Sequence, residues 1–276
     1  MAKYGMIIDL DKCIGCLACV AACKEEYDIP TGLGQQRVRC LEGVRQGRKT
    51  EPNLTEPGIG RNWVYCVEDA DQEGKPGLSF YPGLCNHCDI NPCIDACPSG
   101  ATYKDDDGIV LIDPELCIGC GYCVPACPYG ARYVNQKKGI ADKCTFCRSR
   151  IDVGKQPACV ITCLAKCRYF GDLQDQSSQV GKIVGSENPP GIESAETALK
   201  PNVKYLGKVH RERIKAAGVP GLAHLSPSGK LWTQLLDPMA KVALISGVAG
   251  VVGGVALNRL AERKSKVQTQ KEKIHE

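Results

Sequence analysis

The chain has 276 residues, of which 43% are apolar and only 5% aromatic, and its formal net charge is +4. That length and apolar content allow one sizeable domain with an appendage. The mild positive balance does not predict nucleic-acid binding, because no basic tract stands beside stacking aromatic residues. Nineteen cysteines are the unusual feature of the composition.

The first expected element is a short strand, MIIDL, which leads into the cysteine motif DKCIGCLACVAACK at residues 11–24. A disulfide framework explains this motif poorly, because cysteines so close together on one loop would compete for partners. Structural zinc usually takes two CxxC pairs separated by a longer stretch. The spacing CxxCxxCxxxC is that of [4Fe–4S] ferredoxins, in which three cysteines bind one cluster and the fourth serves a second.

The segment from residue 24 to residue 84 is rich in Gly, Arg and Pro and is expected to be an insertion that packs against a partner. It should contain at least one strand, around RNWVYCVED. In that stretch Trp63 and Tyr65 alternate with Val64 and Cys66, as in a half-buried strand.

Three more cysteine motifs follow along the chain. They read CNHCDINPCIDACP from residue 85, CIGCGYCVPACPYGAR from residue 117, and CTFC followed by PACVITC from residue 144. Together the four motifs use sixteen cysteines, which predicts four [4Fe–4S] clusters. The three cysteines left over are expected to be ordinary buried apolar thiols: Cys40, Cys66 and Cys167.

An internal repeat relates the first and third motifs. Residues 8–23 align without a gap on residues 112–127, with ten of sixteen positions identical. Each copy is expected to be a short strand, a cluster loop and a short helix. Gly15 and Gly119 would let the backbone approach the cluster, and Pro98 and Pro128 would open the turn or helix that leaves the second and third motifs.

The predicted fold class is α+β, with two pseudo-twofold, bacterial-ferredoxin-like modules, insertions, and one C-terminal transmembrane helix. Motifs two and three would form an inner module at 85–139, and motifs one and four an outer module at 1–39 and 140–173, with the insertion at 40–84. Because such modules exchange their fourth cysteine, we expect four crossed ligand groups. These are group 1 (Cys13, Cys16, Cys19, Cys163), group 2 (Cys85, Cys88, Cys93, Cys127), group 3 (Cys117, Cys120, Cys123, Cys97) and group 4 (Cys144, Cys147, Cys159, Cys23).

Beyond this cluster domain, residues 174–236 are expected to be an extended strap that docks on a partner. Residues 242–258 carry no charge, and a helix of that length, ~25 Å, nearly spans a hydrocarbon layer of ~30 Å. We therefore expect a transmembrane helix within 237–260, with residues 239–258 in the membrane; a buried soluble helix is the alternative.

The basic tail at 261–276 would place the C-terminus in the cytoplasm and the cluster domain on the outer face. No signal peptide is visible at the N-terminus, so this location requires a partner that carries the export signal. If the helix only lies on the membrane, a cytoplasmic location follows instead.

Several charged and titratable residues stand near the motifs. Five basic residues are candidates for tuning cluster potentials, with ordinary solvated cations as the alternative: Lys12, Lys143, Arg132, Arg148 and Arg168. The histidines form no ligand pattern: His87, His210, His224 and His275. His87 lies inside CNHC and is expected to be a plain loop histidine. With no phosphate loop or nucleophile motif, the chain is not expected to be an enzyme by itself.

The motifs CNHCDINPCIDACP, CIGCGYCVPACPYGARY and KCTFCRSRIDVGKQPACVITC, followed by RYFGDL, give the chain a family resemblance over about residues 1–210. It resembles the four-cluster electron-transfer subunits of membrane-associated molybdenum and tungsten oxidoreductases, such as formate dehydrogenases and dimethyl sulfoxide, polysulfide and thiosulfate reductases. Two positions depart from the family pattern. Leu164 replaces the usual proline, and Cys167 occupies a place that is commonly alanine.

The resemblance implies a relay of single electrons between a catalytic molybdopterin subunit and a quinone-linked membrane subunit, for example one with haem b. Two alternatives remain open. The chain could be the iron–sulfur subunit of a membrane-bound nickel hydrogenase or another membrane redox complex, or it could be an assembly protein whose clusters are structural.

Overall fold

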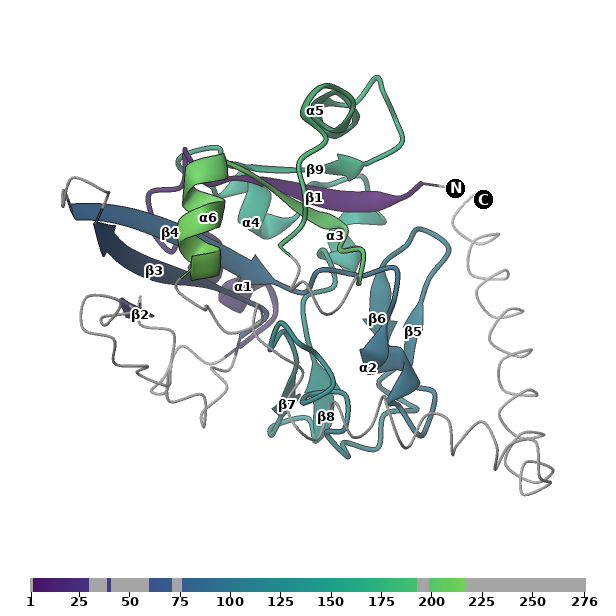
Figure 1. Ribbon diagram of the computed structural model, residues 1–276. Coiled ribbons are helices and arrows are strands. Elements are labelled where there is room, and N and C mark those ends of the chain that lie inside the picture. The colour runs from purple at the N-terminus through teal and green to yellow at the C-terminus, as the bar shows by residue number, and fades with distance from the viewer. Residues whose placement is uncertain (1, 30–38, 41–59, 71–75, 193–198, 217–276) are drawn as a thin grey trace. The chain divides into compact units, whose positions relative to one another are not determined.

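The computed structural model describes residues 2–29, 39–40, 60–70, 76–192 and 199–216 (Figure 1). The chain divides into two compact units, Met1–Ser226 and Pro227–Glu276, and every described residue lies in the first. The strands are β1 (Tyr4–Asp9), β2 (Arg39–Cys40), β3 (Asn62–Ala70), β4 (Pro76–Leu84), β5 (Thr102–Lys104), β6 (Val110–Ile112), β7 (Tyr133–Asn135), β8 (Ile140–Asp142), β9 (Arg168–Asp172) and β10 (Val203–Leu206). The helices are α1 (Ala18–Glu26), α2 (Pro92–Asp95), α3 (Arg148–Ile151), α4 (Ala158–Ile161), α5 (Gln179–Glu187) and α6 (Lys208–Ala216).

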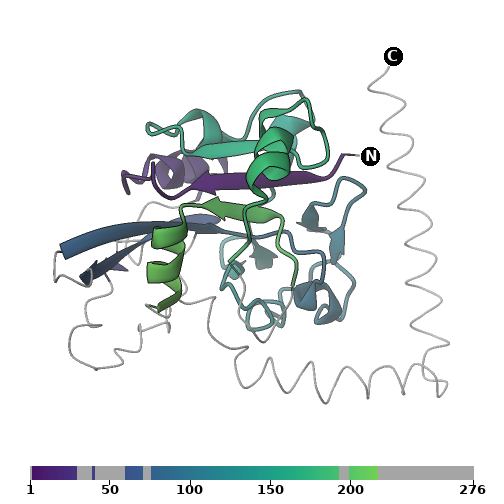
Figure 2. The ribbon, with the colours of Figure 1, turned by 45° about the horizontal axis from the view of Figure 1, so that its top comes forward.

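The N-terminal strand β1 is the centre of a three-stranded sheet, with β9 antiparallel on one side and β10 parallel on the other (Figure 2). Met6, Ile7 and Ile8 are fully buried, as expected for an apolar run covered on both faces. Because β1 leads into the first cysteine motif and β9 leaves the fourth, their antiparallel pairing brings the start of one motif to the end of the other.

A second sheet comes from the insertion. Strands β3 and β4 pair antiparallel from Asn62 opposite Leu84 to Ala70 opposite Pro76, and β2 adds to β3 in parallel. The strand expected around RNWVYCVED is confirmed as β3. It is more buried than the alternating pattern indicates, since Trp63, Val64 and Cys66 are all buried. Helices α1 and α6 both contact this strand, and their packing accounts for the additional burial.

Two short hairpins link the remaining motifs. Hairpin β5–β6 connects the second motif to the third, and hairpin β7–β8 connects the third to the fourth. The strands expected in the repeat are therefore present as β1 and β6. Each cysteine motif thus begins where a strand has just ended, and the strand pairs set the relative positions of the cysteine loops.

The helix expected after each repeated loop forms in only one copy. Helix α1 follows the first loop, whereas residues 122–126 form turns. The first copy is rich in Ala, a strong helix former. In the second copy Pro125 and Pro128 lack the backbone N–H that a helix requires, and the sequence difference explains the structural one.

The described part of the segment after residue 173, residues 174–192 and 199–216, is folded against the cluster domain, in contrast to the expected extended strap. It contains α5, β10 and α6, and Val203, Tyr205 and Ile214 are fully buried. Helix α5 begins at a side-chain cap, with the Ser178 hydroxyl accepting from the Gly181 amide at 3.0 Å. The alternating apolar residues of VKYL explain the strand, because they place Val203 and Tyr205 on one face beside β1.

No helix among residues 2–29, 60–70, 76–192 and 199–216 is long and apolar enough to cross a membrane. The transmembrane helix predicted within 237–260 and the basic tail at 261–276 lie outside the described residues.

Candidate metal centres

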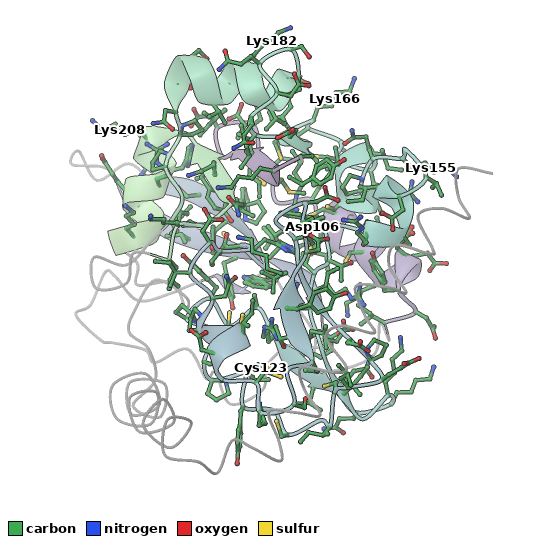
Figure 3. The ribbon with its side chains drawn as sticks, turned by 90° about the vertical axis from the view of Figure 1, so that its right-hand side faces the viewer. Asp106, Cys123, Lys155, Lys166, Lys182 and Lys208 are labelled. Carbon is green, nitrogen blue, oxygen red and sulfur yellow. The ribbon has the colours of Figure 1, made fainter. Side chains whose placement is uncertain are left out.

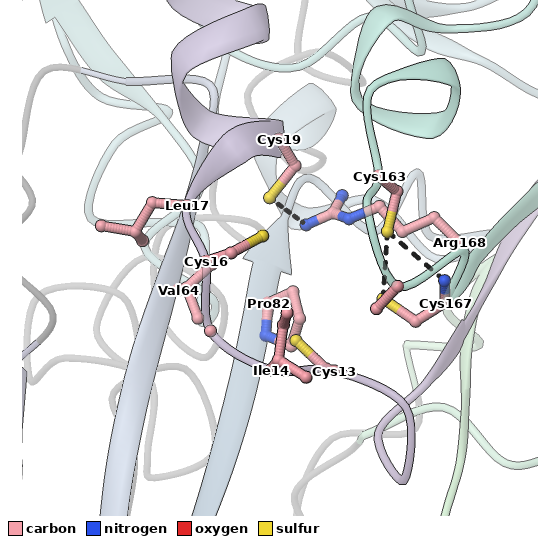
Figure 4. A pocket seen from close by; sticks show the side chains of 12 residues that line it. Cys13, Ile14, Cys16, Leu17, Cys19, Val64, Pro82, Cys163, Cys167 and Arg168 are labelled. Atoms are coloured by element: carbon pink, nitrogen blue, oxygen red, sulfur yellow. Dashed lines mark hydrogen bonds between the residues drawn. The ribbon is translucent and has the colours of Figure 1, made fainter.

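Group 1 surrounds a hollow of about 310 Å³, a measure that includes space open to solvent (Figure 4). The loop between β1 and α1 carries Cys13 and Cys16, and the first turn of α1 carries Cys19. Cys163 follows α4. The pairing of β1 with β9 explains why cysteines about 150 residues apart in sequence meet here. The structure therefore brings all four residues of group 1 together.

The residues of group 4 also lie together, and all four are buried: Cys144, Cys147, Cys159 and Cys23. Cys23 lies on α1 and Cys159 on α4, two helices that contact each other. Burial, and then the neighbouring thiols of group 4, raise the pKa of Cys23. A buried thiol cluster of this kind needs a positively charged centre to become ionised.

Group 2 is assembled in the same way from the end of β4, helix α2 and the turn before β7. Burial, and then nearby Cys85, Cys127 and Cys93, raise the pKa of Cys88. Burial, and then Cys93 and Cys85, raise the pKa of Cys127 to about 12. The four residues of group 2 are therefore neighbours, with a thiol contributed by the third motif among them.

Group 3 comes from the loop after β6 and the turn after α2. Cys117 accepts a hydrogen bond from the Ala141 amide at 3.4 Å, and Cys120 is exposed while Cys123 is buried. Although burial opposes the change, hydrogen bonds from Thr102 and Ser99 lower the pKa of Cys97. Among the described residues no hydrogen bond joins Cys97 to the other three, so this grouping depends on the analogy with group 2.

The four cysteine loops share one backbone feature. The residue two positions after the first cysteine of every motif has a left-handed conformation, with φ of 67° at Gly15, 44° at His87, 70° at Gly119 and 53° at Phe146. Glycine reveals two of these positions in the sequence. Histidine and phenylalanine do not, because left-handed backbone is uncommon for residues with large side chains. The shared conformation indicates that all four loops are built alike.

His87 differs from the expected plain loop histidine. Its side chain is fully buried, its Nδ1 accepts from the Val110 amide at 3.0 Å, and its ring stacks on Phe146 at 3.8 Å between centroids. Burial lowers the pKa of His87 well below its usual value, so the ring is neutral. The stack joins the second motif to the fourth, a contact that local sequence does not reveal.

Three of the five candidate tuning residues are buried: Arg132, Lys143 and Arg168. Arg168 donates from Nη2 to the Cys19 sulfur at 3.4 Å. Burial alone would lower the pKa of its guanidinium, but nearby Cys19 and Cys159 raise that pKa. Arg168 therefore lies between groups 1 and 4.

Arg132 has the corresponding position between groups 2 and 3. It donates to the Thr102 hydroxyl at 3.0 Å, and although its burial opposes protonation, nearby Cys93 and Cys123 raise the pKa of its guanidinium. Within the described residues its Nε and Nη2 have no hydrogen-bond partner. Buried donors without acceptors and buried cations without counter-charges cost several kcal/mol.

These cations provide a test of whether a cluster fits. Within the described part of the chain, none of the three buried cations forms an ion pair with a carboxylate, and Lys143 instead donates to the backbone oxygens of Val110 and Cys144. A cube held by four thiolates is anionic and presents sulfur acceptors, so it would satisfy both the charge and the free N–H groups. The donor set therefore fits [4Fe–4S] clusters.

The other two candidate tuning residues are ordinary paired cations. Lys12 bridges Asp9 at 2.9 Å, and Arg148 bridges Asp105, Asp107 and Asp152 at 2.7, 2.9 and 2.7 Å. Lys12 is largely exposed, and neither residue has a hydrogen bond to a cysteine sulfur in the described structure.

The remaining cysteines and histidines have separate environments. Cys66 and Cys167 are buried, as expected for spare thiols, but the Cys167 sulfur lies 3.4 Å from the Cys163 sulfur. His210 bonds the Ser79 hydroxyl at 2.8 Å. The side chain of Cys40, together with His224 and His275, falls outside the described residues. Across the residues described, no three Cys, His, Asp or Glu side chains are close enough to hold a single metal ion.

The comparisons with known proteins agree with this geometry. Two families described as a 4Fe-4S dicluster domain match, one at residues 12–101 and the other at residues 77–173. The chain is 36% identical over 206 residues to a tetrathionate reductase subunit of Salmonella typhimurium, covering 74% of this chain and 72% of that protein. It is 37% identical over 201 residues to a putative dimethyl sulfoxide reductase iron-sulfur subunit of Halobacterium salinarum (67% and 71% covered).

A third relative is the thiosulfate reductase electron transfer subunit PhsB of Salmonella typhi, 37% identical over 186 residues, with 67% of this chain and 83% of that protein covered. Two dicluster domains correspond to four [4Fe–4S] clusters, which are the cofactors of this chain. The second and third relatives are named as iron–sulfur or electron-transfer subunits and not as catalytic subunits. The chain belongs to the family of iron–sulfur electron-transfer subunits of molybdoenzyme-type reductases.

Proposed function

We propose that the chain carries single electrons between a catalytic molybdopterin subunit, with molybdenum or tungsten, and a quinone-linked membrane subunit. The ligands would be the four crossed groups defined above, and each cluster supplies one-electron chemistry when bound. Because every iron would have a cysteine ligand, no open iron position would remain for a substrate. The observation that supports this proposal most strongly is the order in which the four groups adjoin.

Cysteines from different groups are close enough to influence one another's pKa in three pairs of groups, and these pairs give the proposed order. Burial raises the pKa of Cys93 in group 2, and nearby Cys85 and Cys123 add to the rise. Because Cys123 belongs to group 3, group 2 adjoins group 3. Burial raises the pKa of Cys144 in group 4, and neighbours that include Cys85 add to the rise. Because Cys85 belongs to group 2, group 4 adjoins group 2.

Group 1 completes the line. Burial raises the pKa of Cys159 to about 11 against the nearby charge of Arg168, and Cys19 adds to that rise. The proposed order is therefore 3–2–4–1. Electron tunnelling falls steeply with distance, and adjacent clusters in one line are what a relay requires.

Each of the two terminal groups in this order, group 1 and group 3, has an exposed cysteine. Cys16 in group 1 and Cys120 in group 3 are exposed, whereas all of group 4 is buried. Large apolar side chains stand beside the accessible cysteines, with Ile14 61% exposed next to group 1 and Ile118 68% exposed next to group 3. Exposed apolar residues beside the terminal groups suit docking of an electron donor at one end and an acceptor at the other.

The membrane part of the proposal depends on the sequence of the C-terminal segment. Residues 239–258 would anchor the chain, and the cluster domain would face the outer side as one subunit of an anaerobic respiratory complex. The relatives reported above are subunits of reductases, which favours a reductase partner over the nickel-hydrogenase and assembly-protein alternatives.

Variants Cys120→Ala in group 3 and Cys147→Ala in group 4 test the relay. Both should abolish quinone-linked turnover of the purified complex, because each removes a ligand from a different point in the line. The catalytic subunit should keep its activity with an artificial dye that bypasses this chain. Cys66→Ala, a buried cysteine outside the four groups, is the matched control and should keep both activities. Full quinone-linked turnover in both alanine variants would contradict the relay.

A further inference from the structure

Group 1 has one thiol more than a cluster needs. Five cysteines line its hollow: Cys13, Cys16, Cys19, Cys163 and Cys167. A [4Fe–4S] cube takes four cysteine ligands. Cys13, Cys16 and Cys19 supply three from one loop, so the fourth position has two candidates, Cys163 and Cys167. Figure 4 shows the two side by side at the edge of the hollow opposite that loop.

The contacts of Cys167 place its sulfur within reach of the same position. It is 3% exposed, its sulfur lies 3.4 Å from the Cys163 sulfur, and its amide donates to that sulfur at 3.3 Å. Cys167 is therefore in direct contact with Cys163 and lines the same hollow as the other three cysteines of group 1.

The third motif provides an internal comparison for this arrangement. After its fourth cysteine, Cys127, the turn contains Gly130 with φ of 59°, and the corresponding residue after Cys163 is Lys166 with φ of 47°. Each of these residues donates its amide to the carbonyl of the respective cysteine at 3.1 Å.

The next residue is Ala131 in the third motif and Cys167 in the fourth, both buried, and a buried arginine follows in each case. The two turns thus have the same backbone form, and one of them carries a thiol where the other carries a methyl group.

We propose that Cys167 is an alternative fourth ligand of group 1, able to replace Cys163 on the same iron. In the exchange the Fe–S bond to Cys163 breaks, the bond to Cys167 forms, and the Cys167 proton passes to the Cys163 sulfur across their contact. No electron is gained or lost. The inference rests on the proposed ligand groups, and the experiment below separates the two.

The test measures iron and acid-labile sulfide per chain in the complex purified without oxygen, together with the electron paramagnetic resonance spectrum of the reduced clusters. The variants are Cys163→Ala, Cys163→Ala with Cys167→Ala, and Cys127→Ala as the matched control, since Ala131 offers no spare thiol. Alanine is used because a serine hydroxyl could itself bind iron. Comparison with the unchanged complex removes the contribution of partner clusters.

We expect Cys163→Ala to keep the iron content of the unchanged complex, with an altered spectrum for one cluster. Cys127→Ala and the double variant should each lose one cluster, or up to about four irons per chain. Ala131→Cys added to Cys127→Ala should restore the lost iron, because it recreates the arrangement of Cys163 and Cys167 in the other turn.

The inference is overturned if Cys163→Ala loses as much iron as Cys127→Ala, or if Cys163→Ala fails to assemble. Failure of Ala131→Cys to restore iron would also contradict it. A double variant that keeps all its iron would show instead that neither cysteine is the fourth ligand, and the proposed group 1 would then be wrong. A double variant that fails to assemble while Cys163→Ala keeps its iron supports the inference, because the two differ only at residue 167.

Discussion

Arg168 is the residue at which two proposed ligand groups meet. Its guanidinium is buried, donates to Cys19 of group 1 at 3.4 Å and lies near Cys159 of group 4. Arg132 occupies the same position after the fourth cysteine of its own motif and lies near Cys93 and Cys123. A fixed positive charge beside a cluster favours the reduced form, since reduction adds a negative charge.

Arg168→Met should therefore lower the reduction potentials of two clusters at once, those of groups 1 and 4. With a separation of about 7 Å and an effective dielectric constant of about 20, the lost interaction is about 2 kcal/mol, or roughly 100 mV for one electron. Arg168→Lys keeps the charge and should shift both potentials less. A redox titration followed by electron paramagnetic resonance measures these potentials.

Arg148→Met is the control, because Arg148 is paired with three carboxylates and has no hydrogen bond to a cysteine sulfur in the described structure. It should leave the four potentials close to their original values. A shift of only one potential in Arg168→Met, or none, would contradict a shared role for this arginine.

Among the elements, the turn after the fourth cysteine is the most regular. The third residue beyond the cysteine is left-handed in three motifs, with φ of 64° at Gly100, 59° at Gly130 and 47° at Lys166. A residue with a Cβ atom costs about 1 kcal/mol or more in this conformation, whereas glycine adopts it freely. The fourth motif thus carries a small strain that the other two avoid.

Two substitutions test this strain from opposite directions. Lys166 is exposed, with its side chain projecting outward in Figure 3, so Lys166→Gly should stabilise the cluster-loaded chain by about 0.5–1 kcal/mol, a rise of ~2 °C in the unfolding midpoint. Gly130→Ala should lower the midpoint by a similar amount. A Cβ atom on residue 130 would meet no atom within 4 Å, so the backbone conformation alone would account for the lower midpoint. A lower midpoint for Lys166→Gly would show that the lysine side chain contributes more than its backbone costs.

The elements also show what the sequence can and cannot predict. The cysteine spacing and the 104-residue repeat predict the strands β1 and β6 and the loops that follow them. The repeat does not predict the missing second helix, because two prolines override the similarity around it. The sequence does not predict helices α5 and α6. Segments this short are not stable as isolated helices, and these two are stabilised by packing on β1, β3 and β4.

The site contains comparable surprises. Nothing local marks His87 and Phe146 as left-handed residues that stack on each other, because the stack depends on two loops about 60 residues apart in sequence. Five basic residues near the motifs look alike in the sequence. Only the fold separates Arg132, Lys143 and Arg168, which are buried, from Lys12 and Arg148, which pair with carboxylates.

For the molecule as a whole, the proposed line of groups 3–2–4–1 unites the separate observations. The adjoining cysteines give the order, the buried cations offset the anionic clusters along its length, and the accessible groups with their apolar neighbours stand at its ends. Electrons pass along this line only if one partner supplies them at one end and another removes them at the other end.

The most direct test of this account is elemental analysis of the native complex, solubilised gently from membranes and purified through this chain. We predict about sixteen irons per chain beyond those of the partners, with molybdenum or tungsten in the same fractions. Nickel in place of those metals would assign the chain to a hydrogenase and contradict the proposed partner. Iron near zero in an assembled complex would contradict the four-cluster relay itself.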